Sequence, residues 1–261
     1  MSIHSTAIVS AEATVSPEAE VGPYVVITGS VRIGPHTIVQ SHARLGSPHG
    51  EVVVGAHNLI QSGATLGGPP QDWSYKGGHS QLIIGDHNRI GEGASLNLGS
   101  EKGEGITRVG NRVFVMANAH IGHDCQVGDD VVLTNLAQLA GHVVVESNVI
   151  VGGIVAVTQF VRLGKSSFLA AGAIANKDIL PYTIAEGNWA TPKALNKVGL
   201  KRAGLSEAEL RNLDRAVKLL LKRSLTVPEA LEKIGTDCEA DAYIKHLTRF
   251  VSSSKRGVAR R

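Results

Sequence analysis

Aliphatic residues recur at every sixth position along most of this chain, and this period restricts its possible folds more than any other feature. The first uninterrupted run consists of Ile3, Val9, Val15, Val21, Ile27, Ile33, Val39 and Leu45. The same register returns in residues 54–66 and 84–96 and then continues from Val109 to Leu169. An amphipathic α-helix would place apolar residues about every 3.6 positions, and a half-buried strand would place them about every 2. Neither element accounts for a period of six.

A period of six is typical of short, flat strands that are separated by tight turns. One aliphatic side chain per strand points inward, and a small residue such as Ala7 or Ala13 follows four positions later. Glycine often comes directly after the inward position, as in Val21-Gly22, where it serves the turn. Three strands close a coil of about 18 residues, and such coils stack about 4.8 Å apart. We therefore predict an all-β left-handed parallel β-helix of hexapeptide repeats over residues 1–190.

Two segments break the period, at residues 67–83 and 97–108. Both are polar and rich in glycine, so we expect them to leave the solenoid as loops. Loops on a rigid scaffold often carry binding residues, although neutral surface insertions would look the same in sequence.

Residues 191–261 are predicted to form a C-terminal α-helical domain. Two capping boxes mark helix starts, and they are formed by Ser206 with Glu209 and by Thr226 with Glu229. A third helix is expected over residues 240–251, and the tail over residues 252–261 is expected to be frayed.

The composition favours a cytoplasmic protein. The chain has only two cysteines, too few for a disulfide framework. Its first residues lack the basic and apolar regions of a signal peptide, and no apolar run approaches the about 20 residues that span a bilayer. We therefore expect no integral membrane segment. We also expect no nucleic-acid partner.

The charge of the chain is unevenly distributed. Residues 1–192 contain 10 Lys and Arg against 15 Asp and Glu, a net −5, whereas residues 193–261 contain 16 against 8, a net +8. The basic end is either a solvated helical surface or a docking site for an acidic partner, since basic patches steer such encounters.

Three histidines in the unbroken solenoid are the best catalytic candidates, because the pKa of histidine lies near working pH. They are His120, His123 and His142, and none occupies an inward position of its repeat, so they should project outward. His123 and His142 are 19 residues apart, which places them on adjacent coils. With Asp124 and the backbone N–H of Gly141, they suggest acyl transfer, in which a histidine is the general base and the N–H stabilises the oxyanion.

Two other classes of function stay open at this point. Three histidines on a β-helix could bind zinc, as in the γ-class carbonic anhydrases, but the three-residue spacing of His120 and His123 departs from that family's five. A structural or regulatory solenoid without activity is the other possibility. Cys125 is interpreted as a small buried residue rather than a nucleophile.

Residues 118–160 resemble the acyl-carrier-protein:UDP-N-acetylglucosamine O-acyltransferases, the first enzymes of lipid A synthesis. Further matches are PPQD at 69–72, GNWATP at 187–192 and NKVGLKRAGLS at 196–206. The resemblance covers essentially the whole chain. It implies a homotrimer that takes a (hydroxy)acyl chain from acyl carrier protein and transfers it to the 3-hydroxyl of UDP-N-acetylglucosamine, without cofactor or metal.

The resemblance also assigns roles to residues. His123 would be the general base, Asp124 would orient it, and the N–H of Gly141 would hold the oxyanion. Substrate binding would involve Asp72, Ser74, Asn97, His120, His142, Thr158, Gln159, Asn196 and Arg202. Ala171 would set the acyl-chain length, and its small side chain would leave room for a fairly long chain.

Five of the family's substrate-contacting positions carry other residues in this chain. Ser74 stands for a lysine, Asn97 and Thr158 stand for histidines, Val198 stands for an acidic residue, and Ala203 stands for an arginine. The catalytic residues His123, Asp124 and Gly141 are present. The alternatives are therefore a divergent paralogue that acylates another sugar nucleotide, such as the 3-amino analogue, and a paralogue that has lost activity.

Overall fold

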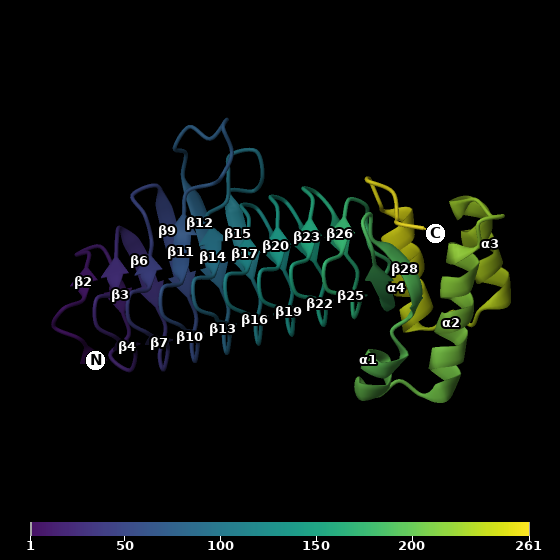
Figure 1. The fold of residues 1–261 in the computed structure, drawn as a ribbon, viewed down its shortest axis with the longest axis horizontal. Coiled ribbons are helices and arrows are strands. Elements are labelled where there is room, and N and C mark those ends of the chain that lie inside the picture. Colours follow the sequence, from purple (N-terminus) through teal and green to yellow (C-terminus); the bar gives the residue numbers. More distant parts are fainter. Residues whose placement is uncertain (1, 261) are drawn as a thin grey trace.

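The computed structural model describes residues 2–260, and most of them wind into a parallel β-helix (Figure 1). Successive strands of one sheet pair in parallel at an offset of 18 residues where no insertion intervenes, as Ser2 does with Glu20 and Val9 with Ile27. The predicted left-handed parallel β-helix with a helical C-terminal end is confirmed.

Three sheets form the sides of the coil. The first sheet contains β1 (Ser2–Ile3), β4 (Glu20–Val21), β7 (Ile38–Val39), β10 (Leu59–Ile60), β13 (Arg89–Ile90), β16 (Phe114–Val115), β19 (Val132–Leu133), β22 (Ile150–Val151), β25 (Phe168–Leu169), β27 (Thr183–Glu186) and β28 (Thr191–Leu195). The second contains β2 (Ile8–Val9), β5 (Val26–Ile27), β8 (Arg44–Leu45), β11 (Thr65–Gly68), β14 (Ser95–Asn97), β17 (His120–Ile121), β20 (Gln138–Leu139), β23 (Ala156–Val157) and β26 (Ile174–Ala175). The third contains β3 (Thr14–Val15), β6 (Ser30–Ile33), β9 (Gly50–Val54), β12 (Ser80–Ile84), β15 (Ile106–Val109), β18 (Gln126–Val127), β21 (Val144–Val145) and β24 (Arg162–Leu163).

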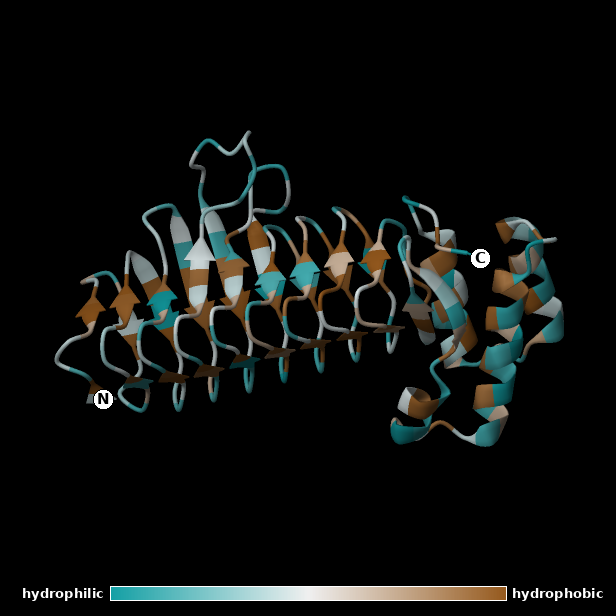
Figure 2. Ribbon diagram, in the orientation of Figure 1, coloured by the Kyte–Doolittle hydropathy of each residue, from teal (hydrophilic) through white to brown (hydrophobic). Residues whose placement is uncertain are grey.

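The aliphatic residues of the six-residue period fill the interior of the coil. All of them are buried except Ile3 and Val9 of the first described coil, which are partly buried and pack against the same core. Hydrophobic residues accordingly recur along the strands from coil to coil (Figure 2). The apolar area removed from water, worth about 25 cal/mol per Å², is the main stabilising contribution to this core.

One corner of the coil, between the second and third sheets, positions the candidate site. Asp124, His142 and Phe160 occupy equivalent places on successive coils and share a left-handed backbone, with φ of 62°, 61° and 65°. Each turn is fixed to its neighbour along the axis, since the N–H of His142 donates to the carbonyl of His123 over 2.9 Å. The side chains at this corner are therefore brought to adjacent levels.

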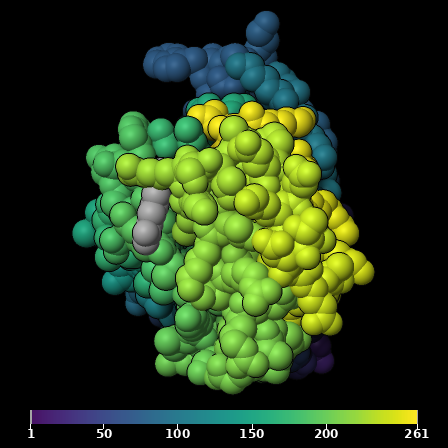
Figure 3. Space-filling model, turned by 90° about the vertical axis from the view of Figure 1, so that its right-hand side faces the viewer, coloured from purple at the N-terminus to yellow at the C-terminus, as the bar shows by residue number. Residues whose placement is uncertain are grey.

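Two excursions leave the coil from this same corner on preceding turns. The first joins β11 to β12 over residues 69–79, and the second joins β14 to β15 over residues 98–105. Both project from the body of the coil (Figure 1), and seen from the helical end they extend beyond its outline (Figure 3).

The described part of the C-terminal end contains four helices, α1 (Lys197–Arg202), α2 (Glu207–Leu221), α3 (Val227–Asp237) and α4 (Ala242–Ser252). Both predicted capping boxes are present, at Ser206 before α2 and at Thr226 before α3. The third predicted helix corresponds to α4, whereas α1 was not predicted. The apolar faces of these helices form a separate core with Leu180 and Tyr182 of the last coil. None of the helices in residues 2–260 is both long enough and apolar enough to cross a membrane.

The prediction of a frayed tail is wrong for residues 252–260. The Ser254 hydroxyl donates to Asp178 over 2.8 Å, and Ala259 is buried and donates its N–H to the carbonyl of Asp178 over 2.8 Å. Arg260 donates to the carbonyls of Leu220, Lys222 and Leu225, which follow or end α2. These bonds hold the tail in place, and the bond to Leu220 gives a partner to a carbonyl in the last turn of α2.

Candidate active site

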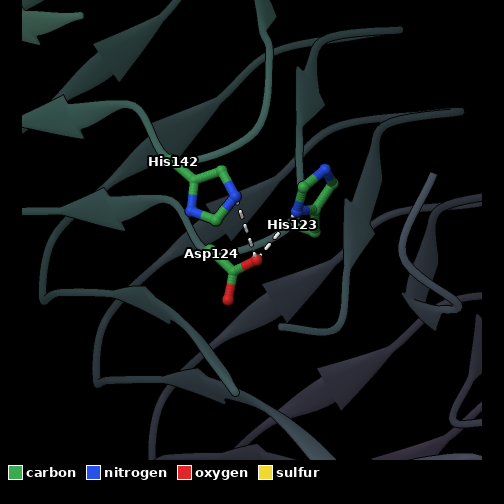
Figure 4. Close-up of side chains that lie close together, drawn as sticks. All are labelled: His123, Asp124 and His142. Carbon is green, nitrogen blue, oxygen red and sulfur yellow. Dashed lines mark hydrogen bonds and ion pairs between the residues drawn. The ribbon is translucent and has the colours of Figure 1, made fainter. Parts of the chain in front are cut away.

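His123 and Asp124 form a hydrogen-bonded pair at the corner that follows β17. Nδ1 of His123 lies 2.8 Å from Oδ2 of Asp124 (Figure 4). Both residues are buried, with 4% and 6% of their surfaces exposed. The pairing of a histidine with a carboxylate, which the sequence suggested from adjacency alone, is present in the structure.

The outward direction expected for the three histidines does not leave the side chain of His123 accessible to solvent. Its side chain does point away from the aliphatic interior, but it is not solvent-exposed. The excursion over residues 98–105 contacts Asp124 beside it, and the backbone of Gly141 lies against its ring. The sequence pattern defines the inside of the coil but does not show which outer surfaces the loops cover.

His142 lies on the next coil, as its 19-residue separation from His123 predicted. The two rings meet edge to face, with centroids 5.0 Å apart and planes at 87°. Nε2 of His142 is 3.7 Å from Oδ2 of Asp124 (Figure 4), and its ring stacks on Phe160 with centroids 4.5 Å apart. Burial lowers the pKa of His142 despite the nearby Asp124 carboxylate, which favours the neutral ring at neutral pH.

His120 occupies the outer face of β17. Its Nδ1 is 2.8 Å from the hydroxyl oxygen of Ser95 on the neighbouring strand β14. Burial lowers the pKa of His120 as well, so this ring is neutral at neutral pH and suited to hydrogen bonding with an uncharged polar group.

The ionisation of Asp124 determines which nitrogen of His123 carries the proton. Burial alone would raise the pKa of Asp124, but hydrogen bonds from His123 and Ser100 outweigh it and hold the pKa below its ordinary value. An ionised carboxylate only accepts hydrogen bonds, so Nδ1 of His123 donates. Nε2 is left with a free lone pair and can act as a base.

Two residues that hold Asp124 were missed by the sequence analysis. Ser100 donates its N–H to Oδ1 over 2.9 Å and its hydroxyl to Oδ2 over 2.5 Å. The hydroxyl of Thr107 accepts the N–H of Asp124 over 2.8 Å. Both lie in the segment 97–108 that breaks the repeat, which was the only available signal.

Gly141 lies directly against the imidazole ring of His123. A Cβ at this position would lie 2.5 Å from both Cε1 and Nε2 of His123, so no larger residue fits without moving the imidazole. Among the hydrogen bonds of residues 2–260, none has the N–H of Gly141 as its donor. This N–H is therefore free to bind an oxygen beside Nε2.

A cavity of about 360 Å³ opens on the outer face of the second sheet at this point. Five predicted site residues line it, namely His120, His123, Gly141, Thr158 and Gln159. Gln71, Gly122, Gln138, Leu139, Ala140, Ala156 and Val157 complete the lining. The hydroxyl of Thr158 is buried and lacks a hydrogen-bond partner among the described residues. The cavity thus combines a base, a free N–H and an apolar floor.

The first excursion carries Asp72 to the edge of this site. Ser74 donates its N–H and its hydroxyl to Oδ1 of Asp72, each over 2.8 Å, and Lys102 of the second excursion lies 3.2 Å from Oδ2. The bonds from Ser74, backbone first, lower the pKa of Asp72 to about 2. The buried Asn97 side chain donates to the carbonyl of Pro69 and so ties β14 to the same excursion.

The remaining predicted site residues do not line the cavity in this chain. Asn196 caps α1, where its Oδ1 accepts from Gly199 N over 3.1 Å and its Nδ2 donates to the carbonyl of Ser166 over 3.0 Å. Arg202 is exposed in the last turn of α1. Ala171 lies in the exposed turn that follows β25.

Two further positions at which this chain departs from the family pattern also lie at α1. Val198 lies within α1 and is 61% exposed, and Ala203 caps the C-terminus of that helix.

His123, Asp124 and His142 also meet a geometric criterion for a metal site, because one potential ligand atom from each lies within 4.8 Å of the others. The donor set fits a metal poorly. Nδ1 of His123 carries the proton that it donates to Asp124, and both Asp124 oxygens accept from Ser100. A metal would have to replace these hydrogen bonds, whereas Nε2 of His123 faces Gly141 instead.

Two protein-family models match the chain. The model for domain 2 of UDP-N-acetylglucosamine O-acyltransferase matches residues 178–259. The model for the six repeats of the bacterial transferase hexapeptide matches residues 106–141.

Full-length relatives match both the sequence and the structure. The acyl-[acyl-carrier-protein]–UDP-N-acetylglucosamine O-acyltransferases of Anaeromyxobacter sp. strain K and Herminiimonas arsenicoxydans are each 39% identical, with 100% and 99% of both chains covered. The crystal structure of UDP-N-acetylglucosamine O-acyltransferase from Moraxella catarrhalis superposes with a TM-score of 0.95 at 39% identity over 100% of both chains. The Francisella novicida UDP-N-acetylglucosamine acyltransferase gives a TM-score of 0.95 at 37% identity over 99% of this chain and 94% of its own. The chain therefore belongs to the acyl-[acyl-carrier-protein]–UDP-N-acetylglucosamine O-acyltransferase family.

Proposed function

We propose that this protein transfers a (hydroxy)acyl chain from acyl carrier protein to the 3-hydroxyl of UDP-N-acetylglucosamine, the first step of lipid A synthesis, in the cytoplasm. The observation that carries the proposal is the buried His123–Asp124 pair, whose free Nε2 lies beside the unpaired N–H of Gly141. Membership of the family supplies the substrate classes.

The chemistry follows from the positions of these three groups. Nε2 of His123 removes the proton of the sugar hydroxyl as its oxygen attacks the thioester carbonyl, and a C–O bond forms. The N–H of Gly141 stabilises the negative charge that develops on the carbonyl oxygen. The tetrahedral intermediate then expels the carrier thiolate as the C–S bond breaks, and the thiolate takes the proton back from His123. Asp124 stabilises the imidazolium in between.

Residues around the cavity would position the two substrates. Asp72 accepts hydrogen bonds from sugar hydroxyls, and the neutral rings of His120 and His142 line the approach of sugar and acyl chain. Thr158 and Gln159 line the same cavity, and Gln159 would contact the nucleotide half. Ser74 and Asn97 act indirectly, because one holds Asp72 and the other holds the excursion that carries it.

A homotrimer is part of the proposal. Asn196 and Arg202 lie at α1, outside the cavity of their own chain, yet the family resemblance assigns them to the nucleotide and its phosphates. A second copy placed beside the cavity would supply them. Ala171, in an exposed turn, would limit the acyl chain in the same arrangement, and its small side chain leaves room for a long one.

The acidic carrier protein would dock on the basic C-terminal domain. Arg211 and Lys218 are exposed on α2, and Lys222 is exposed where it caps the C-terminus of that helix. Reversing the charge of Arg211 and Lys222 together (Arg211→Glu, Lys222→Glu) should raise the KM for acyl carrier protein about 10-fold, because rim charges mainly affect association. The KM for the sugar nucleotide should stay unchanged in the same steady-state assay. Lys233→Glu, an exposed lysine on α3, is the matched control, and an equal effect in this variant would argue against a specific surface.

A panel assay tests the proposed function. Purified protein would be offered acyl carrier proteins of several chain lengths with UDP-N-acetylglucosamine or its 3-amino analogue, and the products would be identified by mass spectrometry. The expected product is the 3-O-acyl sugar nucleotide. Exclusive acylation of the amino analogue would instead identify a divergent acceptor, and no product with any pair would contradict the proposal.

We also expect the active protein to contain no stoichiometric zinc. His123 uses Nδ1 to hold Asp124, and the general-base step needs its Nε2 uncoordinated. Elemental analysis of the purified protein should therefore find far less than one zinc per subunit, and chelator should leave acyl transfer unchanged. About one ion per subunit, together with activity that chelator abolishes, would favour a carbonic-anhydrase-like site instead.

A further inference from the structure

The second excursion places one serine directly on the catalytic carboxylate. Ser100 lies between β14 and β15 and is 1% exposed. It donates its backbone N–H to Oδ1 of Asp124 over 2.9 Å and its hydroxyl to Oδ2 over 2.5 Å. The same Oδ2 accepts Nδ1–H of His123 over 2.8 Å. Ser100 is thus the only residue in the described chain that binds both oxygens of this carboxylate.

The excursion is built so that Ser100 stays in this position. Its carbonyl accepts the N–H groups of Gly103 and Gly105, each over 3.1 Å, which closes the loop on Ser100. A Cβ on Gly103 would lie 2.3 Å from Oδ1 of Asp124, and a Cβ on Gly99 would lie 2.1 Å from the backbone nitrogen of Ile106. Glycine at these two places allows the loop to approach Asp124 so closely.

Ser100 also affects the state of the base through the carboxylate. A buried anion is costly unless hydrogen-bond donors surround it, and the donors from Ser100 help to keep Asp124 ionised. Two donors on different oxygens also fix the plane of the carboxylate. That plane determines the direction of the bond to Nδ1 of His123, and so where Nε2 points relative to Gly141.

We propose that Ser100 is a positioning residue for acyl transfer, which holds the Asp124 carboxylate so that His123 presents an unprotonated Nε2 beside Gly141. This inference rests on the proposed function of the site. The loop-closing bonds to Gly103 and Gly105 use only the carbonyl of Ser100, and its N–H also stays when the side chain is shortened. Ser100→Ala therefore removes one donor from Asp124 and leaves the loop intact.

The test compares Ser100→Ala and Ser100→Thr with Glu104→Ala, an exposed residue of the same excursion. Losing a hydrogen bond to a charged group should lower kcat of Ser100→Ala by about 10- to 100-fold. The KM for the sugar nucleotide should stay within about two-fold, since Ser100 is not part of the cavity lining. Ser100→Thr keeps the hydroxyl and should recover most of kcat, and Glu104→Ala should match the wild type.

A spectroscopic measurement separates positioning from a merely structural role. In protein labelled with ¹⁵N-histidine, the ring nitrogen resonances of His123 are assigned as those that disappear in a His123→Asn variant. In the wild type these resonances should show a single tautomer, with the proton on Nδ1. Ser100→Ala should show a mixture of tautomers or a displaced Nδ1–H resonance, while its circular dichroism spectrum stays unchanged. If Ser100→Ala does not fold, Ser100→Cys, with a weaker donor, takes its place in both measurements.

The outcomes are distinguishable. Absence of acyl transfer by the wild type would overturn the proposed function and the kinetic part of this inference, but the tautomer measurement would still test the control of His123 by Ser100. An active wild type with kcat and His123 resonances unchanged in Ser100→Ala would overturn the inference alone. A loss of kcat that Ser100→Thr does not restore, with His123 resonances as in the wild type, would also overturn it.

Discussion

Replacing His123 with asparagine is expected to lower kcat by about 10³-fold, since a positioned general base contributes about 10²- to 10⁴-fold. The asparagine amide can still donate to Asp124, as Nδ1 of His123 does, but it has no basic nitrogen. The loss should therefore appear in kcat, and the melting temperature and the oligomeric state should change little. Steady-state acyl transfer and thermal unfolding measure the two effects separately.

Alanine at position 123 tests a second effect, the loss of the hydrogen bond between His123 and Asp124. His123→Ala removes the donor to a buried carboxylate and leaves a cavity, so it should also cost about 1–3 kcal/mol of stability. His87→Asn is the matched control, because His87 is exposed on another corner of the coil. If His123→Asn kept kcat within about 10-fold of the wild type, His123 would not be the general base.

Gly141→Ala is expected to lower kcat by about 10²-fold or more, comparable to the loss of an oxyanion-hole donor. The new Cβ would lie 2.5 Å from Nε2 of His123, so the ring or the Gly141 backbone must move. Either movement would separate Nε2 of His123 from the N–H of Gly141. The backbone of Gly141 does not have a positive φ, so alanine brings no conformational strain of its own.

Gly153→Ala is the control for this prediction. Gly153 lies in the turn that follows β22, and the nearest atom to an added Cβ there is 3.6 Å away, an ordinary contact. It should retain wild-type kcat and melting temperature. Equal activity in Gly141→Ala and wild-type protein would mean that neither the ring position nor this N–H limits the reaction.

The fold could be predicted because its core requirement is local. Each strand buries one aliphatic residue, so the period of six in the sequence directly reflects the coil. The helix starts at Ser206 and Thr226 were also local, because a capping box lies within four residues. The prediction of a frayed tail was wrong because the contacts of the tail are not local. Its partners, Asp178 and the carbonyls near the end of α2, lie 35 or more residues away.

The features of the candidate site also divide into local ones, which could be predicted, and non-local ones, which could not. The meeting of His123 and His142 followed from the coil length, and the pair of His123 and Asp124 followed from their adjacency. The burial of His123 and the role of Ser100 did not follow. Ser100 reaches Asp124 across 24 residues, through a loop whose path depends on glycine contacts that no repeat pattern encodes.

The stacking of coils divides the long axis of the β-helix into equal steps. Turns in the same corner follow one another at about 4.8 Å, and α1 follows the last coil in the chain, beyond the coils that carry His123 and His142. The axial separation between the His123 corner and α1 can therefore change only in whole steps, by gain or loss of a complete coil. While the number of coils stays the same, this spacing is fixed. A different acceptor of the same length must then be accommodated by changes in side chains and in the two excursions.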